Sequence, residues 1–454
     1  MVGIERRIKA ARASPASEKT IVADGSVGSE VQAGKGLDRV RVAHFVQRYP
    51  PALGGSEAYF ARLSRFLAAS GDSVNVFTTQ ALDLEAFWSR RGKCLDPGTS
   101  VEDGVTIHRY DLLRWPGRRY FLKTLSLVPS RLWQCLTLPC NPIAPGMWRT
   151  AGRPGQRFDV VHATAFPYAW PIACARRLAR RLRVPFLITP FVHLGDPDDP
   201  RDPSRRAYLS PALLWLLRSA DRIFVQTELE RRALLREGLA EERLILLGMG
   251  VEVAECTGGD RAAARKSWGI ATDEVVIGHL ANNSVEKGSV DLLRAAEGAW
   301  HSGKRFHVVL AGPEMSNFQR FWRHYGHASR VRRLGVLNDR QKRDFFAGID
   351  IFALPSRSDS FGLVLLEAWA NGIPNVAYRA GGVAEVMHHE SDGLLVPCGN
   401  VNALAGALMR LVENPVLRQK LGASGKVRTQ KEFRWQDKLE RVQAVYKEVV
   451  AGQR

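Results

Sequence analysis

The chain has few cysteines and no apolar run long enough to cross a bilayer. Its six cysteines are scattered and form no CxxC pair, which argues against a structural zinc site and for reduced thiols in a cytosolic protein. No stretch of about 18 uncharged apolar residues occurs, so the sequence predicts no transmembrane helix. The basic N-terminus MVGIERRIKAARAS lacks an apolar segment, which argues against a secretory signal.

Acidic residues are also scarce relative to basic ones. Asp and Glu number 46 against 65 Lys and Arg, so the net charge is +19. Such a charge favours an anionic partner, which could be nucleic acid, anionic lipid or a phosphorylated substrate. Because no zinc-finger, RNP-type or basic-zipper pattern occurs, we expect no nucleic-acid partner. At 454 residues and 45% hydrophobic content, the chain is long enough for two or three domains.

The most informative stretch runs from Pro355 to Gly399. A polar loop, 356–360, leads into an apolar run, 361–370, whose spacing predicts a helix. A glycine turn at 381–382 leads into a second predicted helix, 383–388. Each unit therefore points a helix N-terminus out of a loop of small residues, where free amides and the helix dipole suit a phosphate or another anion.

Two acidic residues of this stretch are candidate site residues. Asp359 lies in the first loop, and Glu367 lies two turns into the helix, where it could accept a hydrogen bond from a sugar or ribose hydroxyl. The stretch resembles the donor-sugar site of the GT-B glycosyltransferases of the large retaining family 4. That family carries two acids separated by seven residues, a spacing that Asp359 and Glu367 keep, although the first acid is usually Glu. The alternative is an ordinary βαβα unit in which Asp359 caps the helix and Glu367 faces solvent.

The N-terminal half predicts a βαβ unit. A strand over 41–46 is followed by a loop, QRYPPALGGS, a helix over 57–69 and a strand over 73–78. The loop is not GxGxxG, so it carries no dinucleotide fingerprint. Its YPP…GGxE pattern, with Gly54 and Gly55, resembles the family loop that faces the donor diphosphate. A turn that needs two glycines for backbone reasons is the alternative.

Two further residues match the family. His193 follows a predicted strand in a TP-x-x-H setting, and the resemblance implies a position beside the donor sugar. Lys287 precedes Gly288, as in the family's lysine–glycine pair, whose cation neutralises the donor diphosphate. The family's second cation, an arginine, is replaced by His279, which leaves one fixed charge where two are expected. Asp196-Pro197-Asp198 is formally a DxD sequence, but we assign no metal to it.

The resemblance implies an α/β GT-B architecture, with two Rossmann-like doubly wound domains that face each other across a cleft. It covers about residues 40–450. The boundaries that we expect are a mobile tail at 1–37, an N-terminal acceptor-side domain at 38–255, a C-terminal nucleotide-sugar-binding domain at 270–432, and a helix at 433–454 that crosses back to the first domain.

The implied reaction is retaining transfer of a hexosyl group from a nucleotide-diphosphate sugar to a hydroxyl of a glycan or lipid-linked acceptor, without a cofactor or metal. The alternatives are a nucleotide-sugar 2-epimerase of the same fold and a non-catalytic sugar-nucleotide-binding protein. The expected catalytic residues are His193, Lys287 and Asp359. The expected donor-binding residues are Gly54, Gly55, Lys287, Ser360, Phe361, Gly362, Leu363 and Glu367.

Residues 112–149 interleave arginines and a lysine with aromatic residues and contain no acid. This mixture is typical of a membrane interface, where aromatic rings lie at headgroup level and cations meet anionic lipid. A pair of core helices with a basic outer face is the alternative. The sequence therefore predicts a cytoplasmic protein and leaves open a peripheral position on the inner face of the membrane.

Overall fold

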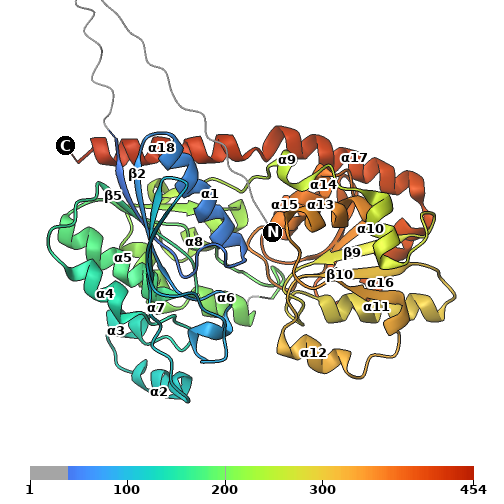
Figure 1. Ribbon diagram of the computed structural model, residues 1–454, viewed down its shortest axis with the longest axis horizontal. Coiled ribbons are helices and arrows are strands. Elements are labelled where there is room, and N and C mark those ends of the chain that lie inside the picture. The colour runs from blue at the N-terminus through green and yellow to red at the C-terminus, as the bar shows by residue number, and fades with distance from the viewer. Residues whose placement is uncertain (1–38, 200, 454) are drawn as a thin grey trace, which may run out of the picture. The chain divides into compact units, whose positions relative to one another are not determined.

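The computed structural model describes residues 39–199 and 201–453, so the predicted tail at 1–37 lies outside the described residues. Two sheets, each covered by helices, organise these residues (Figure 1). The first sheet has eight strands in the order β3-β4-β2-β1-β5-β6-β7-β8. Its strands are β1 (Arg41–Phe45), β2 (Ser73–Thr79), β3 (Gly98–Glu102), β4 (Val105–Tyr110), β5 (Val160–Ala163), β6 (Phe186–Ile188), β7 (Arg222–Val225) and β8 (Leu244–Leu246).

The second sheet has six parallel strands in the order β11-β10-β9-β12-β13-β14. In chain order this is 3-2-1-4-5-6, the Rossmann arrangement, so the predicted α/β fold with two doubly wound sheets is confirmed. The strands are β9 (Val276–Leu280), β10 (His307–Ala311), β11 (Val331–Arg333), β12 (Ile351–Leu354), β13 (Asn375–Arg379) and β14 (Gly393–Pro397). Strands such as β12, IFAL, are buried throughout, as parallel strands covered on both faces should be.

Helices connect the parallel strands of each half. In the first half they are α1 (Gly55–Ala69), α2 (Arg118–Leu125), α3 (Arg131–Leu136), α4 (Pro145–Gly152), α5 (Ala169–Leu182), α6 (Pro203–Tyr208), α7 (Pro211–Arg218) and α8 (Glu228–Arg236). The short helix α9 (Val253–Cys256) follows β8 and packs against helices of the second half. In the second half they are α10 (Arg261–Trp268), α11 (Ser289–His301), α12 (Ser316–Trp322), α13 (Asp339–Gly348), α14 (Leu363–Ala370), α15 (Val383–Val386), α16 (Val401–Glu413) and α17 (Pro415–Glu432).

Both helices predicted in the stretch 355–399 are present. α14 begins at Leu363, where the predicted helical spacing begins, because the Asp359 carboxylate accepts the amides of Phe361 and Gly362 and Gly362 takes a positive φ of 84°. The helix predicted over 383–388 ends at Val386, where the chain turns extended.

The last helix, α18 (Trp435–Ala451), follows α17 and packs against α1 of the first half, whereas α17 packs on α14. Both are red in Figure 1 and run past the two sheets. The Tyr446 hydroxyl lies 3.0 Å from Nε2 of His44 and 2.6 Å from Nδ1 of His162, so it connects α18 to the neighbouring strands β1 and β5.

Both histidines of this cluster are neutral. Burial lowers the pKa of His44 to about 3 and that of His162 well below its usual value. A neutral imidazole has one donor and one acceptor nitrogen. The second nitrogens meet the hydroxyls of Ser64 and Thr189, each at 2.8 Å, so the buried polar groups of the cluster satisfy one another.

The basic–aromatic segment 112–149 divides into an exposed and a buried part. The exposed apolar side chains lie on and around α2 and α3, and they include Tyr120, 82% exposed, and Leu127, 77% exposed. By contrast, Met147 of α4 is fully buried. Arg118 is buried too and donates to the carbonyls of Leu113 and Asn141, so it is not one of the surface cations that the pattern suggests. Among the described residues, no helix is both long and apolar enough to span a membrane.

We expect Tyr446→Phe to lower the free energy of unfolding by about 1–3 kcal/mol for each buried nitrogen that it leaves unpaired. Urea unfolding followed by circular dichroism measures this loss. Tyr120→Phe is the matched control, because the Tyr120 side chain is exposed. Equal unfolding midpoints for the two variants would show that the Tyr446 hydrogen bonds do not stabilise the docked helix.

Candidate active site

Lys287 and Asp359 meet at the carboxyl edge of the second sheet. Lys287 lies in the loop between β9 and α11, and Asp359 in the loop between β12 and α14. The Lys287 Nζ lies 2.8 Å from Asp359 Oδ2. The loops touch at Gly288, where a Cβ would lie 1.8 Å from the Pro355 carbonyl oxygen, so only glycine permits this approach. Ligands of open α/β sheets bind at this edge.

The two oxygens of Asp359 serve different partners. While Oδ2 meets Lys287, Oδ1 accepts the amides of Gly362 at 3.1 Å and Phe361 at 3.4 Å. Burial raises the pKa of Asp359, but the Lys287 cation, with the loop amide of Phe361, outweighs burial and holds it below the usual value. Asp359 is therefore ionised at neutral pH, and it both caps the loop before α14 and pairs with the lysine.

His193 reaches the same place from the first half of the chain. It follows β6, and its ring stacks on that of Tyr208 in α6 at a centroid distance of 4.8 Å. Burial, with the nearby Lys287 cation, lowers the pKa of His193 to about 4, so the imidazole is neutral. The charges of Lys287 and Asp359 both act on it. The structure thus brings together His193, Lys287 and Asp359, which lie far apart in the sequence.

Glu230 of α8 holds the segment that carries His193. Its carboxylate accepts the Val192 amide at 2.9 Å and the Gln226 amide at 2.6 Å. The Thr-x-x-Glu spacing of Thr227 and Glu230 predicts a capping box. The Thr227 hydroxyl does accept the Glu230 amide at 3.1 Å, but the Glu230 side chain turns to Val192 instead. The sequence did not reveal that Glu230 binds the Val192 amide, because the capping-box motif by itself explains why Thr227 and Glu230 are present.

The glycine loop before α1 lies against the start of α14. A Cβ on Gly55 would lie 3.7 Å from Leu363 Cδ1, and a Cβ on Gly54 would lie 2.1 Å from Glu57 Oε2. The Glu57 carboxylate is buried and held by Arg48, whose Nε lies 2.8 Å away. Glycine at position 54 therefore makes room for a buried ion pair. The loop at 54–55 and the predicted donor residue Leu363 face each other.

Glu367 borders a cavity of about 210 Å³. Its Oε1 lies 2.5 Å from Lys342 Nζ, on α13. Its Oε2 is buried and has no hydrogen-bond partner among the described residues. An unpaired buried carboxylate oxygen is unfavourable unless a ligand supplies a donor. The cavity wall also includes Arg62, Glu255, Leu363 and Trp435. Sequence reasoning did not find Lys342, because no motif marks it.

The residues at two motif positions outside the predicted site, His279 and the DxD sequence, are held by other contacts. His279 is fully buried, and its two nitrogens lie 2.8 Å from the Ala353 carbonyl oxygen and the Ser289 hydroxyl. Burial lowers its pKa to about 4, so it supplies no charge in place of the family's arginine. In the DxD sequence, Asp196 Oδ1 accepts the Asp198 amide at 3.0 Å, which is a local turn.

The backbone amides of the second glycine turn, 381–382, already have hydrogen-bond partners in the protein. The Gly381 amide donates to the Gly195 carbonyl at 2.6 Å, and the Gly382 amide donates to the Asp359 carbonyl at 2.8 Å. The following helix, α15, has four residues, so its dipole is small. Of the two predicted anion sites, the start of α14, beside Lys287 and Asp359, is therefore the stronger one. A cation, an ionised carboxylate and a neutral imidazole there suit an anionic group attached to a polyhydroxy group.

The chain is similar in sequence to known glycosyltransferases. Residues 260–428 match the family model for glycosyl transferases group 1, and residues 54–250 match that for a glycosyl transferase 4-like domain. D-inositol 3-phosphate glycosyltransferases are similar in sequence. The enzyme of Acidothermus cellulolyticus is 28% identical over 424 residues, which cover 88% of this chain and 87% of the relative. The enzyme of Kribbella flavida is 26% identical over 419 residues, which cover 87% of this chain and 90% of the relative.

Solved structures share the fold. Sucrose-phosphate synthase from Thermosynechococcus elongatus has a TM-score of 0.67 and 21% identity, and the similarity covers 91% of this chain and all of that one. Anabaena HepE in complex with UDP-glucose has a TM-score of 0.64 and 16% identity, with 90% of this chain and all of the other covered.

We expect Glu230→Gln to remove a pH-dependent part of the stability. Burial raises the pKa of Glu230 from 4.5 to about 7, so the folded chain binds this proton more tightly than the unfolded chain. Stability is then lost as the pH rises from about 4.5 to about 7, by roughly 3 kcal/mol. Glutamine mimics the protonated acid and should lack this fall.

Urea unfolding of both proteins at about pH 5 and about pH 8 measures the effect as a difference between them, because the other acids titrate in both. If the two proteins lose the same stability over this range, Glu230 does not titrate there.

Proposed function

The chain is a GT-B glycosyltransferase of family 4, and from this premise we propose that it moves a sugar from a nucleotide-diphosphate sugar to a hydroxyl of a glycan or lipid-linked acceptor, with retention of the anomeric configuration. The main support for a nucleotide-sugar donor is the buried Oε2 of Glu367, which borders a cavity and has no hydrogen-bond partner among the described residues. A ribose hydroxyl would donate to this oxygen, while Lys342 holds the other oxygen and fixes the orientation of the carboxylate.

The donor diphosphate would lie between the Gly54–Gly55 loop and Lys287, at the start of α14. In support, Gly55 already approaches Leu363, and the loop at 360–363 leads into the N-terminus of α14. The amides of Ser360 to Leu363 would complete the cradle. Since His279 is neutral and buried, Lys287 would be the main fixed charge that stabilises the departing nucleotide.

The donor sugar would lie between Asp359 and His193. The Asp359 carboxylate would accept sugar hydroxyls, and the neutral His193 would offer one donor and one acceptor from the other side. Asp359 is already engaged by Lys287 and two amides, which does not suit a free attacking nucleophile. The family resemblance implies instead that a donor phosphate oxygen assists the incoming acceptor hydroxyl.

The acceptor would carry negative charge. The relatives are named for inositol 3-phosphate, a phosphorylated polyol, and the net charge of +19 favours an anionic acceptor or surface. The similar structure of Anabaena HepE was solved in complex with UDP-glucose, which supports a uridine donor as the first to test.

A panel of UDP, GDP and ADP sugars tests the donor class. The true donor should raise the thermal unfolding midpoint by mass action in the parent protein and less in Glu367→Ala. Product analysis with a phosphorylated polyol or a lipid-linked glycan then tests transfer. Release of free nucleotide only when acceptor is present excludes a 2-epimerase, and saturable nucleotide binding without transfer to any acceptor would instead support a non-catalytic binding protein.

Loss of the Glu367 carboxylate and loss of the Asp359 carboxylate should affect different kinetic constants. We expect Glu367→Ala mainly to weaken nucleotide binding, because its free oxygen is set for a ribose hydroxyl. Asp359→Ala should mainly lower turnover, by roughly the ~3 kcal/mol in activation free energy that loss of one electrostatic stabiliser brings.

Steady-state kinetics with the true donor separate the two effects as KM and kcat. Asp359→Glu is the conservative control and should keep measurable activity, because the family holds the longer acid. Full turnover in Asp359→Ala would reduce Asp359 to a cap of the loop before α14.

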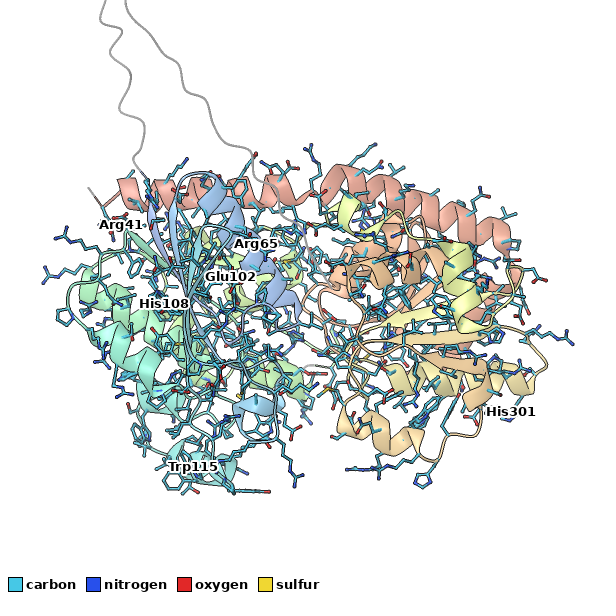
Figure 2. The ribbon with its side chains drawn as sticks, viewed as in Figure 1. Arg41, Arg65, Glu102, His108, Trp115 and His301 are labelled. Atoms are coloured by element: carbon cyan, nitrogen blue, oxygen red, sulfur yellow. The ribbon has the colours of Figure 1, made fainter. Side chains whose placement is uncertain are left out.

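We also propose that the exposed part of the basic–aromatic segment rests on an anionic membrane surface. Apolar side chains at 40–82% exposure stand among exposed cations on and around α2 and α3, and no acid occurs from residue 112 to residue 158. Figure 2 shows Trp115 at the outer end of the first half, beside α2. The exposed apolar residues are Leu113, Tyr120, Phe121, Leu127, Val128 and Trp133.

Binding to anionic vesicles should fall as salt rises, since the cations are screened. Replacing the exposed Arg119, Lys123 and Arg131 by glutamine should weaken binding roughly 100-fold, at about 1 kcal/mol for each cation. The control replaces three exposed cations of the second half, Arg323, Arg340 and Lys420. Equal vesicle binding by the two triple variants in a flotation assay would rule out this surface.

A further inference from the structure

A group of three side chains on the second half lies apart from the proposed donor site and is independent of the proposed function. Glu297 and His301 lie one turn apart in α11, so they share one face of the helix. His327 comes from the stretch that follows α12. One ligand atom of each residue can be chosen so that all three lie within 4.8 Å of one another.

The distances suit a shared cation better than an ion pair. Nε2 of His327 lies 3.4 Å from Oε1 of Glu297, which is longer than a good N–H···O hydrogen bond. Two ligands of one tetrahedral zinc ion, with bonds of about 2.0–2.1 Å, lie about 3.3 Å apart. The ring of His301 meets that of His327 edge-on at a centroid distance of 4.9 Å, so the exposed His301 side chain lies beside the other two.

The geometry points to a divalent-metal site of the zinc type formed by Glu297, His301 and His327. Two imidazoles and one carboxylate are ligands that Zn²⁺ prefers, whereas Mg²⁺ and Ca²⁺ prefer oxygen alone. The side chains of Glu297 and His327 are 37% and 29% exposed, so water can complete four-coordination.

The ligands stand on fixed supports. The Trp300 ring, whose Nε1 donates to the Phe306 carbonyl at 3.1 Å, lies 5.8 Å from the His327 ring. The Tyr325 hydroxyl donates to the Leu293 carbonyl at 3.2 Å and so ties the stretch that carries His327 to α11. Pre-positioned ligands lower the ordering entropy that a bound metal must offset.

The metal would lie away from the proposed donor site and take no part in glycosyl transfer. α11 begins directly after Gly288, and its 13 residues place His301 about 20 Å along the axis from that end. Figure 2 shows His301 at the outer edge of the second half. A bound ion would join the C-terminal end of α11 to the stretch after α12 and stabilise this half.

Zinc titration of the metal-free, tag-free full chain by calorimetry tests the site. The expected result is one Zn²⁺ per chain, with affinity at least tenfold lower in His301→Ala, in His327→Ala and in Glu297→Gln. His324→Ala is the matched control, because His324 is an exposed histidine of the same stretch outside the three ligands. Zinc should raise the thermal unfolding midpoint of the parent and of His324→Ala, but not that of His301→Ala/His327→Ala.

Unchanged zinc affinity in His301→Ala/His327→Ala would overturn the proposal, as would the absence of zinc binding by the parent. Co²⁺ added to the parent gives a second measurement that needs no variant. A visible spectrum of four-coordinate Co²⁺, removed by one equivalent of Zn²⁺, is expected, and a six-coordinate spectrum identical to that of free Co²⁺ counts against the site. Neither result depends on glycosyl transfer, so failure here leaves the proposed function untouched.

Discussion

The contact between Lys287 and Asp359 organises the candidate site. It joins the loops that follow β9 and β12, neighbouring strands of the second sheet, and it forms only because Gly288 lets the two loops approach. The partly buried pair is stable because each charge has a partner, and the loop amides give the carboxylate further donors. His193, from the first half, is neutral because burial and this lysine act on it together. Burial is the larger cause for His193, and the Lys287 cation adds to it, while Lys287 keeps the buried Asp359 ionised.

Much of the fold could be predicted because its signals are local. Buried parallel strands appear as short apolar runs, so the strands predicted over 41–46 and 73–78 agree with β1 and β2 to within one residue. The antiparallel pair β3 and β4 has no such apolar run in β3 and was not predicted. Asp359, Lys287 and His193 could be selected because motifs mark them. That the three side chains lie together is a property of the tertiary structure, which no local pattern contains.

What the sequence did not reveal depends on contacts between distant segments. Tyr446 meets His44 and His162 across hundreds of residues, and Lys342 meets Glu367 from another helix. For Arg118, local sequence gave a wrong expectation of exposure. Its neighbours in sequence suggest a surface cation, yet two backbone carbonyls bind it inside the first half, and burial lowers its pKa to about 10. A local pattern shows which residue types are present, whereas burial in the tertiary structure determines the charge state and the hydrogen-bond partners of each residue.

The proposed donor diphosphate would compete with Asp359 for Lys287. With His279 turned into the core, Lys287 is the charge available to a diphosphate at this edge, yet it is paired with Asp359 Oδ2. A bound diphosphate would draw Lys287 toward itself, because two anions then compete for one cation. Asp359 Oδ2 would be released for a sugar hydroxyl, while Oδ1 stays on the loop amides and keeps the carboxylate in place. Binding of the phosphate and recognition of the sugar would thus be coupled through a single lysine, which two fixed cations would not require.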